Sequence, residues 1–296
     1  MTCPFLQEAQ VKYCRTATVR KLIPLAQSGQ NDEKCVSAEH RACKVFQAQL
    51  SPEEAGPDGP CPYLRESLMQ YCSAAPVAKM VPYSESLLSR CGNDSFRYCE
   101  LYLAMARPST PVEEADGFAL PSGLRYTANH MWLDVSEDGV CHVGIDSYLS
   151  RVVGPLERLT YVQTKGRHRP TAVLTAAGVD LEVTFPNPIQ LTACNLYLRA
   201  HPSRITSEPY TAGWLFEGVP LPETADNLMD GAAARDWMEQ EQRRMTEFLQ
   251  QEQPGQPRTL ADGGQFAPGL AHRLERERLL VLFHEFFSPY ASGKRV

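Results

Sequence analysis

The chain has 296 residues, of which 43% are hydrophobic and 22% are charged, and its formal net charge at pH 7 is -6. This composition predicts a folded protein with more than one domain, and the negative charge argues against nonspecific nucleic-acid binding. No apolar run approaches the about 18 residues of a membrane-spanning helix, and the first residues lack a signal-peptide pattern. We therefore expect a cytoplasmic protein without nucleic-acid or membrane partners.

A tandem repeat occupies the first part of the chain. A shift of 58 positions superimposes residues 1–50 on residues 59–107, with a two-residue length difference in the middle. Each copy reads C-x10-C, a spacer of 20 or 18 residues, and C-x7-C. Both spacings suit one helix face, so we predict a helical hairpin for each copy. The cysteines are Cys3, Cys14, Cys35 and Cys43 in the first copy, and Cys61, Cys72, Cys91 and Cys99 in the second.

Three interpretations of these cysteines remain open. A reducing compartment favours a four-cysteine metal site in each copy, with zinc ahead of an iron–sulfur cluster. Because a continuous helix holds Cys3 and Cys14 about 16 Å apart, this site requires the chain to break near Pro4 or Tyr13. The second interpretation is a pair of disulfides, from Cys3 to Cys43 and from Cys14 to Cys35. The third is a set of buried thiols, since cysteine is among the most buried residue types.

Short alternating strands follow a polar linker at residues 108–122. This pattern indicates a β-sandwich or barrel, with one short helix near Ser147–Val153. The predicted strands are Met131–Val135, Val140–Ile145, Leu159–Val162, Thr171–Thr175, Leu181–Phe185 and Ile189–Ala193. The predicted fold class is α+β, with helical repeats first, a β domain at residues 123–225, and helices at residues 226–296.

The motifs of this β domain resemble those of the glycine cleavage system H protein. They include Tyr126-x3-His130-x-Trp132, Val143-Gly144-Ile145-x2-Tyr148, Asn195, and Glu208-Pro209-Tyr210-x2-Gly213-Trp214-Leu215, in that order. The resemblance covers residues 124 to 225, about a third of the chain. It implies a barrel-sandwich hybrid fold with a lysine on an exposed β-hairpin. In that family the lysine carries lipoate between partner enzymes.

The carrier lysine is missing from this chain. Counting back from Pro186, the resemblance puts its position at Gly178, and no lysine occurs between Gly166 and Gly293. Lipoate is joined through a primary amine, so we predict that this domain carries no lipoate. The leading hypothesis is a non-lipoylated adaptor that docks the protein partners of a lipoyl- or redox-dependent complex, with structural metal in the repeats.

Aromatic residues supply the candidate docking surface. In the β domain the resemblance indicates His130, Trp132, Tyr210 and Trp214, although a packed position at a strand edge is equally compatible with His130. Asp226–Gln250 and the segment from Leu270 to Phe287 have helical apolar patterns, separated by a flexible linker at residues 251–268. The last helix carries Phe283, Phe286 and Phe287, and it either packs on its own domain or docks in the groove of a partner.

No independent catalytic motif is present in the sequence. Cys141 and His142 point to opposite faces of a strand, which disfavours a shared site, and we expect Cys141 and Cys194 to be buried thiols. The alternative function is a redox protein, in which the repeats hold iron–sulfur clusters or reactive thiols and the β domain directs it to a partner.

Overall fold

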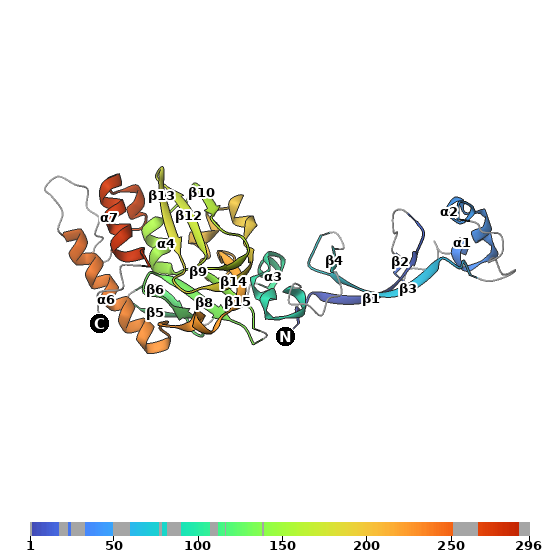
Figure 1. The fold of residues 1–296 in the computed structure, drawn as a ribbon, viewed down its shortest axis with the longest axis horizontal. Helices are drawn as coiled ribbons and strands as arrows, with labels where there is room; N and C mark the ends of the chain where they lie inside the picture. The colour runs from blue at the N-terminus through green and yellow to red at the C-terminus, as the bar shows by residue number, and fades with distance from the viewer. Residues whose placement is uncertain are drawn as a thin grey trace. The chain divides into compact units, whose positions relative to one another are not determined.

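The computed structural model describes residues 2–17, 23–24, 33–49, 60–76, 79–81, 90–106, 112–115, 117–137, 139–250 and 266–289. The chain divides into two compact units, Met1–Phe96 and Arg97–Val296 (Figure 1). Within the described ranges, no helix has the length and the apolar composition needed to cross a membrane.

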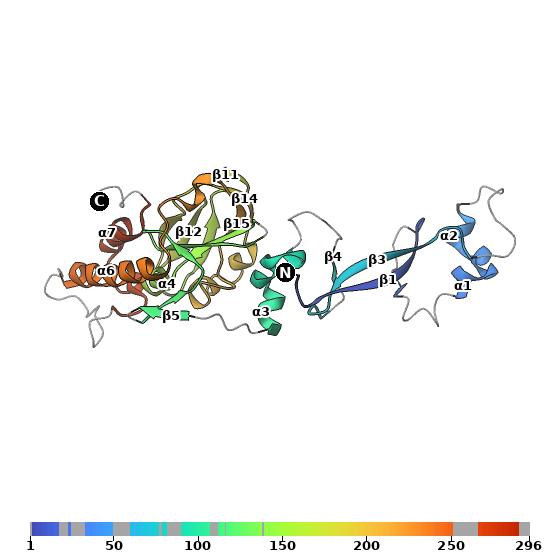
Figure 2. The same cartoon turned by 90° about the horizontal axis from the view of Figure 1, so that it is seen from below.

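The first unit is built around two long antiparallel strands. Strand β1 (Leu6–Cys14) pairs along its whole length with β3 (Leu64–Cys72), so each repeat contributes one strand. The short strands β2 (Ile23–Pro24) and β4 (Lys79–Val81) complete a sheet with the order β2-β1-β3-β4. Figure 2 shows β1 and β3 side by side, with the short helices α1 (Glu33–Val36) and α2 (Lys44–Gln47) near one end.

The prediction of a helical hairpin is wrong for the first half of each repeat. Cys3 lies just before strand β1, and Cys14 is the last residue of that strand. The segment is a strand because its backbone groups pair with those of the other repeat across nine residue pairs. The second halves are helical as predicted. They form α1, η2 (Ala38–Ala42) and α2 in the first repeat, and η3 (Arg90–Gly92), η4 (Asp94–Tyr98) and α3 (Glu100–Ala106) in the second.

The second unit contains a six-stranded sheet and a three-stranded sheet, which enclose one apolar core. The order is β11-β14-β15-β9-β8-β7 in the larger sheet and β10-β12-β13 in the smaller one. The strands are β7 (Arg125–Tyr126), β8 (Met131–Val135), β9 (Cys141–Ile145), β10 (Arg158–Tyr161), β11 (Gly166–His168), β12 (Thr171–Ala176), β13 (Val179–Thr184), β14 (Ile189–Cys194) and β15 (Phe216–Pro220).

The six strands and the helix predicted for this domain are confirmed, with ends that differ by up to two residues. Helix α4 (Ser147–Val153) begins where the Asp146 carboxylate accepts a hydrogen bond from the Leu149 amide, 2.9 Å away. It ends at Gly154, which has a φ of +68°. Strands β7, β11 and β15 were not predicted, because they are short or interrupted by glycine and proline.

Two long helices close the core of the second unit. Helix α6 (Gly231–Gln250) buries one stripe of its surface, and α7 (Arg276–Phe287) buries a denser one that reaches β13. Of the two alternatives for the last helix, packing on its own domain is therefore the one observed (Figure 1). The short helices α5 (Arg204–Ser207), η5 (Leu196–Arg199), η6 (Pro222–Ala225) and η7 (Leu270–His272) connect the larger elements.

The division of the chain differs from the predicted segments. The boundary between units falls at Phe96, inside the second repeat, and the C-terminal helices share the core of the β domain. Part of the predicted linker at residues 108–122 is ordered as a hairpin of β5 (Val112–Ala115) and β6 (Phe118–Pro121). Of the linker at 251–268, residues 251–265 lie outside the described residues, whereas Phe266 is buried.

Candidate functional site

The hairpin of β12 and β13 is the site where a carrier lysine is expected. Ala176 pairs with Val179, so the turn consists of Ala177 and Gly178 alone. Both have positive φ values, +49° and +70°, which is the backbone twist that two-residue hairpins favour. The Gly178 amide donates a hydrogen bond to Glu157 Oε1, 3.1 Å away. The structure thus has the hairpin and puts Gly178 at its turn.

No lysine side chain is present at this turn. Lys165 is exposed, but it lies in the bend before β11, a strand of the other sheet. The space around Gly178 is open, since a Cβ atom added there meets nothing within 4 Å. Steric crowding therefore does not account for the glycine, and the positive φ of the turn does favour it.

Most of the side chains predicted to dock a partner are buried in the core of the second unit, so the prediction of an exposed docking surface is wrong for them. His130, Trp132 and Phe287 have no exposed surface, Trp214 and Phe286 are 2% exposed, and Phe283 is 6% exposed. Tyr210 is partly buried. These aromatic residues stabilise the fold instead.

Hydrogen bonds explain why several motif residues occupy these positions. The Trp132 indole donates to the carbonyl oxygens of Ile145, at 2.9 Å, and Pro209, at 3.1 Å. The Tyr210 hydroxyl donates to the Ala119 carbonyl at 2.6 Å and accepts from the Ser147 amide at 2.8 Å. The motif thus fastens the Pro209–Tyr210 segment to the sheet and to the start of α4.

Gly144 and Gly213 fill positions that admit no side chain. A Cβ atom on Gly144 would lie 2.6 Å from the Trp132 ring, and one on Gly213 would lie 2.7 Å from the carbonyl oxygens of Arg204 and Glu208. The close approach of backbone to ring at Gly144 explains the motif Val143-Gly144-Ile145 in structural terms.

His130 forms a buried charged cluster with two carboxylates. Its Nδ1 lies 2.8 Å from Asp146 Oδ2, and its Nε2 lies 3.8 Å from Glu241 Oε2, which is ion-pair distance rather than hydrogen-bond distance. Burial lowers the pKa of His130, but Asp146 and then Glu241 outweigh it and raise the pKa to about 9. Arg244 continues the cluster through a 2.9 Å contact with Glu241.

Aromatic rings surround the imidazole on several sides. The Tyr148 ring stacks on it with a centroid distance of 4.3 Å, and the rings of Trp237 and Phe287 lie at 4.5 and 5.3 Å. These contacts join the turn before β8 to α4, α6 and α7. Because a protonated imidazole is attracted to aromatic faces and to carboxylates, the cluster stabilises the domain.

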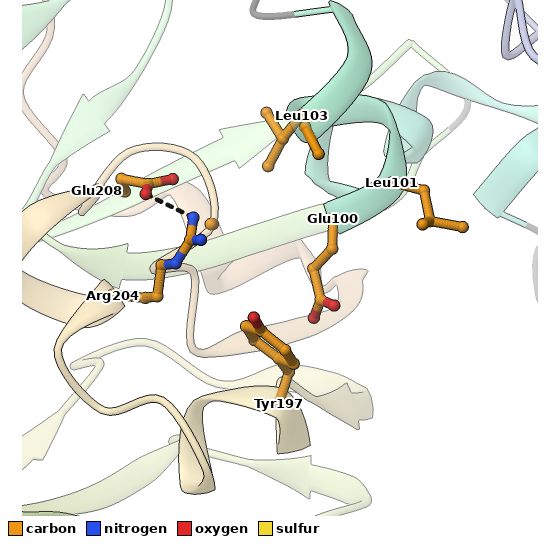
Figure 3. Close-up of a pocket in the computed structure, with 8 residues that line it drawn as sticks. Glu100, Leu101, Leu103, Tyr197, Arg204 and Glu208 are labelled. Atoms are coloured by element: carbon orange, nitrogen blue, oxygen red, sulfur yellow. Dashed lines mark hydrogen bonds and ion pairs between the residues drawn. The ribbon is translucent and has the colours of Figure 1, made fainter. Parts of the chain in front are cut away.

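A surface pocket of about 400 Å³ lies in the second unit beside α3 (Figure 3). Figure 3 shows Arg204 turned toward Glu208, and its Nη1 lies 2.5 Å from Glu208 Oε1. The lining combines leucine and alanine side chains with the ion pair of Arg204 and Glu208. The lining consists of Glu100, Leu101, Leu103, Ala104, Tyr197, Arg204, Glu208 and Ala212.

Cys141 and His142 do not form a metal pair. His142 Nε2 lies 3.0 Å from Glu217 Oε2, and its ring stacks on Tyr98 with a centroid distance of 4.0 Å. Burial raises the pKa of Cys141 to about 12 and the pKa of Cys194 to about 11. Cys141 is fully buried and Cys194 is partly buried, so both thiols stay protonated at neutral pH.

The repeat cysteines fall at two ends of the β1–β3 ribbon. Cys14 is the last residue of β1, and Cys3, from the same repeat, precedes the first residue of that strand. Burial raises the pKa of Cys14, but hydrogen bonds from Thr16 and Ala17 outweigh it, so the pKa lies below its ordinary value. Within the described ranges, no three histidine, cysteine or acidic side chains are already close enough to ligate a metal ion.

The four cysteines of one repeat are not brought together. A nine-residue strand separates Cys3 from Cys14, and such a strand spans about 30 Å. A metal site that holds both Cys3 and Cys14 is therefore incompatible with this structure. A disulfide from Cys3 to Cys43 is incompatible as well, because Cys43 precedes α2, whose Phe46 contacts Tyr63 at the Cys14 end of the ribbon. The spacing of the cysteines in the sequence is compatible with both arrangements, because it does not reveal which strand pairs with β1.

A family model and several known proteins match the part of the chain that contains the β domain. A family model described as glycine cleavage H-protein matches residues 124–241. The H protein 1 of Pseudomonas syringae pv. tomato is 30% identical over 101 residues, which are 33% of this chain and 80% of that protein. The H protein of Halorhodospira halophila is 31% identical over 121 residues, 38% of this chain and 91% of that protein.

A crystal structure of an H protein from Mycobacterium marinum is also similar, with 22% identity and a TM-score of 0.35, and the match covers 41% of this chain and 98% of that one. The two sequence relatives are 30% and 31% identical to this chain, which covers 80% and 91% of their lengths. The motif residues, the hairpin and these relatives together lead to one conclusion: the chain belongs to the glycine cleavage H-protein family.

Proposed function

We propose that this protein is a non-lipoylated H-protein-like adaptor, which binds a protein partner through its second unit and a structural metal through its cysteine-rich repeats. The observation that carries the proposal is the β12–β13 hairpin, which has a tight turn at Ala177 and Gly178 but no lysine. Amide-linked lipoate requires a primary amine at that turn. A domain with this hairpin but without the amine can dock but cannot shuttle a group.

The partner class follows from the family. Relatives of this chain are named as H proteins of the glycine cleavage system, so the candidate partner is an enzyme that recognises an H-type domain. The docking surface would involve exposed groups near the hairpin or the pocket beside α3, since the motif aromatics are buried. We place the protein in the cytoplasm, where thiols stay reduced and metal binding is favoured over disulfides.

A competition assay tests the adaptor. The full-length chain is added to glycine cleavage enzymes that are assayed with a lipoylated H protein. We expect the chain to support no turnover by itself and to inhibit competitively when the lipoylated protein is present. Turnover without added H protein would refute the non-carrier assignment, and no inhibition at a large excess would refute docking to these enzymes.

Metal analysis tests the other half of the proposal. Protein purified without oxygen is expected to be colourless and to contain zinc at a fixed ratio to the chain. An iron–sulfur absorption band in the visible range would replace the structural role with electron transfer, because such clusters are redox centres held by cysteine thiolates. Protein without bound metal, when expressed with zinc, would refute the metal-binding role.

A further inference from the structure

Strand β1 of the first repeat pairs with β3 of the second, and this pairing decides which cysteines are neighbours. In the register of β1 and β3, Cys14 pairs with Leu64 and Leu6 pairs with Cys72. Each cysteine that ends a strand therefore lies beside the start of the other repeat. Paired residues in an antiparallel sheet have Cα atoms about 4.5 to 5.5 Å apart.

Cys61 lies at the same end of the ribbon as Cys14. The Leu64 amide donates a hydrogen bond to the Cys61 carbonyl, 2.9 Å away, which closes a turn with Pro62 in its second position. The Arg15 amide donates to the Tyr63 carbonyl at 2.9 Å and so extends the pairing beyond Cys14. The turn brings Cys61 back toward the strand pair that Cys14 ends.

The second half of the first repeat contributes the other two cysteines. The Cys61 amide donates to the Cys35 carbonyl at 2.7 Å, which links the turn directly to α1. Cys43 immediately precedes α2, whose Phe46 ring lies 5.8 Å from the Tyr63 ring. The Tyr63 hydroxyl also donates to the Gln49 carbonyl at 3.4 Å, so α2 is fastened to the same turn.

We propose that Cys14, Cys35, Cys43 and Cys61 together hold one zinc ion, so that three ligands come from the first repeat and one from the second. The inference rests on the metal-binding part of the proposed function and specifies its ligands. Four thiolates in a tetrahedron are a characteristic ligand set of structural zinc. As the ion binds, the four thiols release their protons and the side chains close on the metal.

His40 is the competing ligand candidate in this region, and its contacts indicate a packing role. It is buried, its Nδ1 lies 2.7 Å from the Ser37 carbonyl, and its ring packs edge-on against Phe46 at 4.7 Å. The repeat alignment matches His40 with Phe96, which is also buried. An apolar ring at the equivalent position supports a core role rather than ligation.

The other end of the ribbon repeats the same backbone contacts. The Cys3 amide donates to the Cys91 carbonyl at 2.9 Å, as Cys61 does to Cys35, and the Ser73 amide donates to the Phe5 carbonyl at 2.9 Å. Cys72 ends β3 there as Cys14 ends β1. Cys3 and Cys72 therefore belong to a different site from Cys14 and Cys61.

Two double variants of the full-length chain separate this arrangement from one site per repeat. The eight repeat cysteines suffice for two four-cysteine sites, so the wild type is expected to bind two zinc ions. In C14S/C61S both changes fall in one proposed site, and we expect one ion to remain. In C3S/C14S the changes fall in two proposed sites, and we expect both ions to be lost to a competing chelator.

Sites confined to single repeats would give the opposite pattern, with both ions lost in C14S/C61S and one retained in C3S/C14S. That pattern would overturn the shared site but leave the proposed metal-binding function intact. Wild-type protein that binds no zinc would instead overturn the proposed function itself. The two failures are therefore distinguishable.

A second measurement does not depend on the variants folding. Metal-free wild type is oxidised mildly and its disulfides are mapped by mass spectrometry. Disulfides that join Cys61 to Cys14, Cys35 or Cys43 are expected, because only neighbouring thiols form them readily. Predominant joining of Cys3 to Cys43 would overturn the inference.

Discussion

His130 Nδ1 and Asp146 Oδ2 lie 2.8 Å apart in the core, where neither side chain is exposed. The same carboxylate caps α4 through the Leu149 amide, so one residue holds both the imidazole and the start of a helix. Glu241, from α6, faces the other ring nitrogen at 3.8 Å. The charge of His130 thus couples the turn before β8 to two helices that follow it in the chain.

The stability of the second unit is expected to depend on pH through this cluster. The pKa of His130 is raised from 6.5 to about 9, because the two carboxylates outweigh burial. A raised pKa in the folded state means that the stabilisation is complete below pH 6.5 and is lost as the pH rises through 9. Denaturant unfolding followed by tryptophan fluorescence should show a falling free energy of unfolding over this range.

His130→Gln is the matching variant for that measurement, since glutamine is polar but does not titrate. This variant should have a lower free energy of unfolding than the wild type at pH 6.5. Its free energy of unfolding should then fall much less than that of the wild type between pH 6.5 and pH 9. A wild-type free energy of unfolding that is flat between these pH values would mean that the folded imidazole is neutral.

Gly144→Ala is expected to destabilise the second unit by about 1–3 kcal/mol, the usual cost of overpacking a core. The added methyl would lie 2.6 Å from the Trp132 ring, and two hydrogen bonds of the indole prevent the ring from moving away. Thermal unfolding provides the measurement. Gly92→Ala is the control, because its Cβ would meet nothing within 4 Å, and it should leave the transition of the second unit unchanged.

Two neighbouring residues of α7 test whether that helix belongs to the core. Leu282 is completely buried and Val281 is 57% exposed. Leu282→Ala should cost about 2–5 kcal/mol of unfolding free energy, as other buried leucines do. Val281→Ala should change it by about 0.5 kcal/mol or less. Equal effects of the two substitutions would show that α7 is not packed on the domain in solution.

The missing amine can be restored at the hairpin turn. Wild type treated with lipoate and a lipoate ligase should gain no mass, including at exposed Lys165, whereas Gly178→Lys should gain one lipoyl adduct. The substitution should cost about 1 kcal/mol, because φ at Gly178 is +70° and left-handed backbone is unfavourable for lysine.

Gly123→Lys is the matched control for that experiment. Gly123 has a φ of +89° and open space around its Cβ, but it lies outside the β12–β13 hairpin. It should remain unmodified in intact mass spectra. A lipoyl adduct on the wild type would contradict the assignment of a non-carrier domain.

Local sequence patterns predicted the elements of the β domain well. The short apolar run of Met131–Val135 and the helix near Ser147–Val153 are short-range signals, and both elements form where they were expected. The turn at Gly178 was also predictable, because positive φ restricts the residue type. Burial of His130 was not, since a histidine at a strand end is compatible with either a surface or a core position.

The repeats show the opposite outcome. The spacing of Cys3 and Cys14 fits a helix face as well as a strand, and only the pairing with β3 decides between them. The partner of each strand comes from the other repeat, 58 residues away, and no local pattern encodes that choice. The same limit applied to α7, whose aromatic face suited an external groove as well as its own domain.

By itself, the sequence determined that the hairpin turn has no amine, because the presence of a lysine is a covalent property that folding does not alter. It also determined the family, through motif residues whose order is fixed along the chain. Only the tertiary structure decided which cysteines are neighbours and which aromatic rings are buried. Both depend on contacts between distant segments, and those contacts arise when separate elements cover one another's apolar faces.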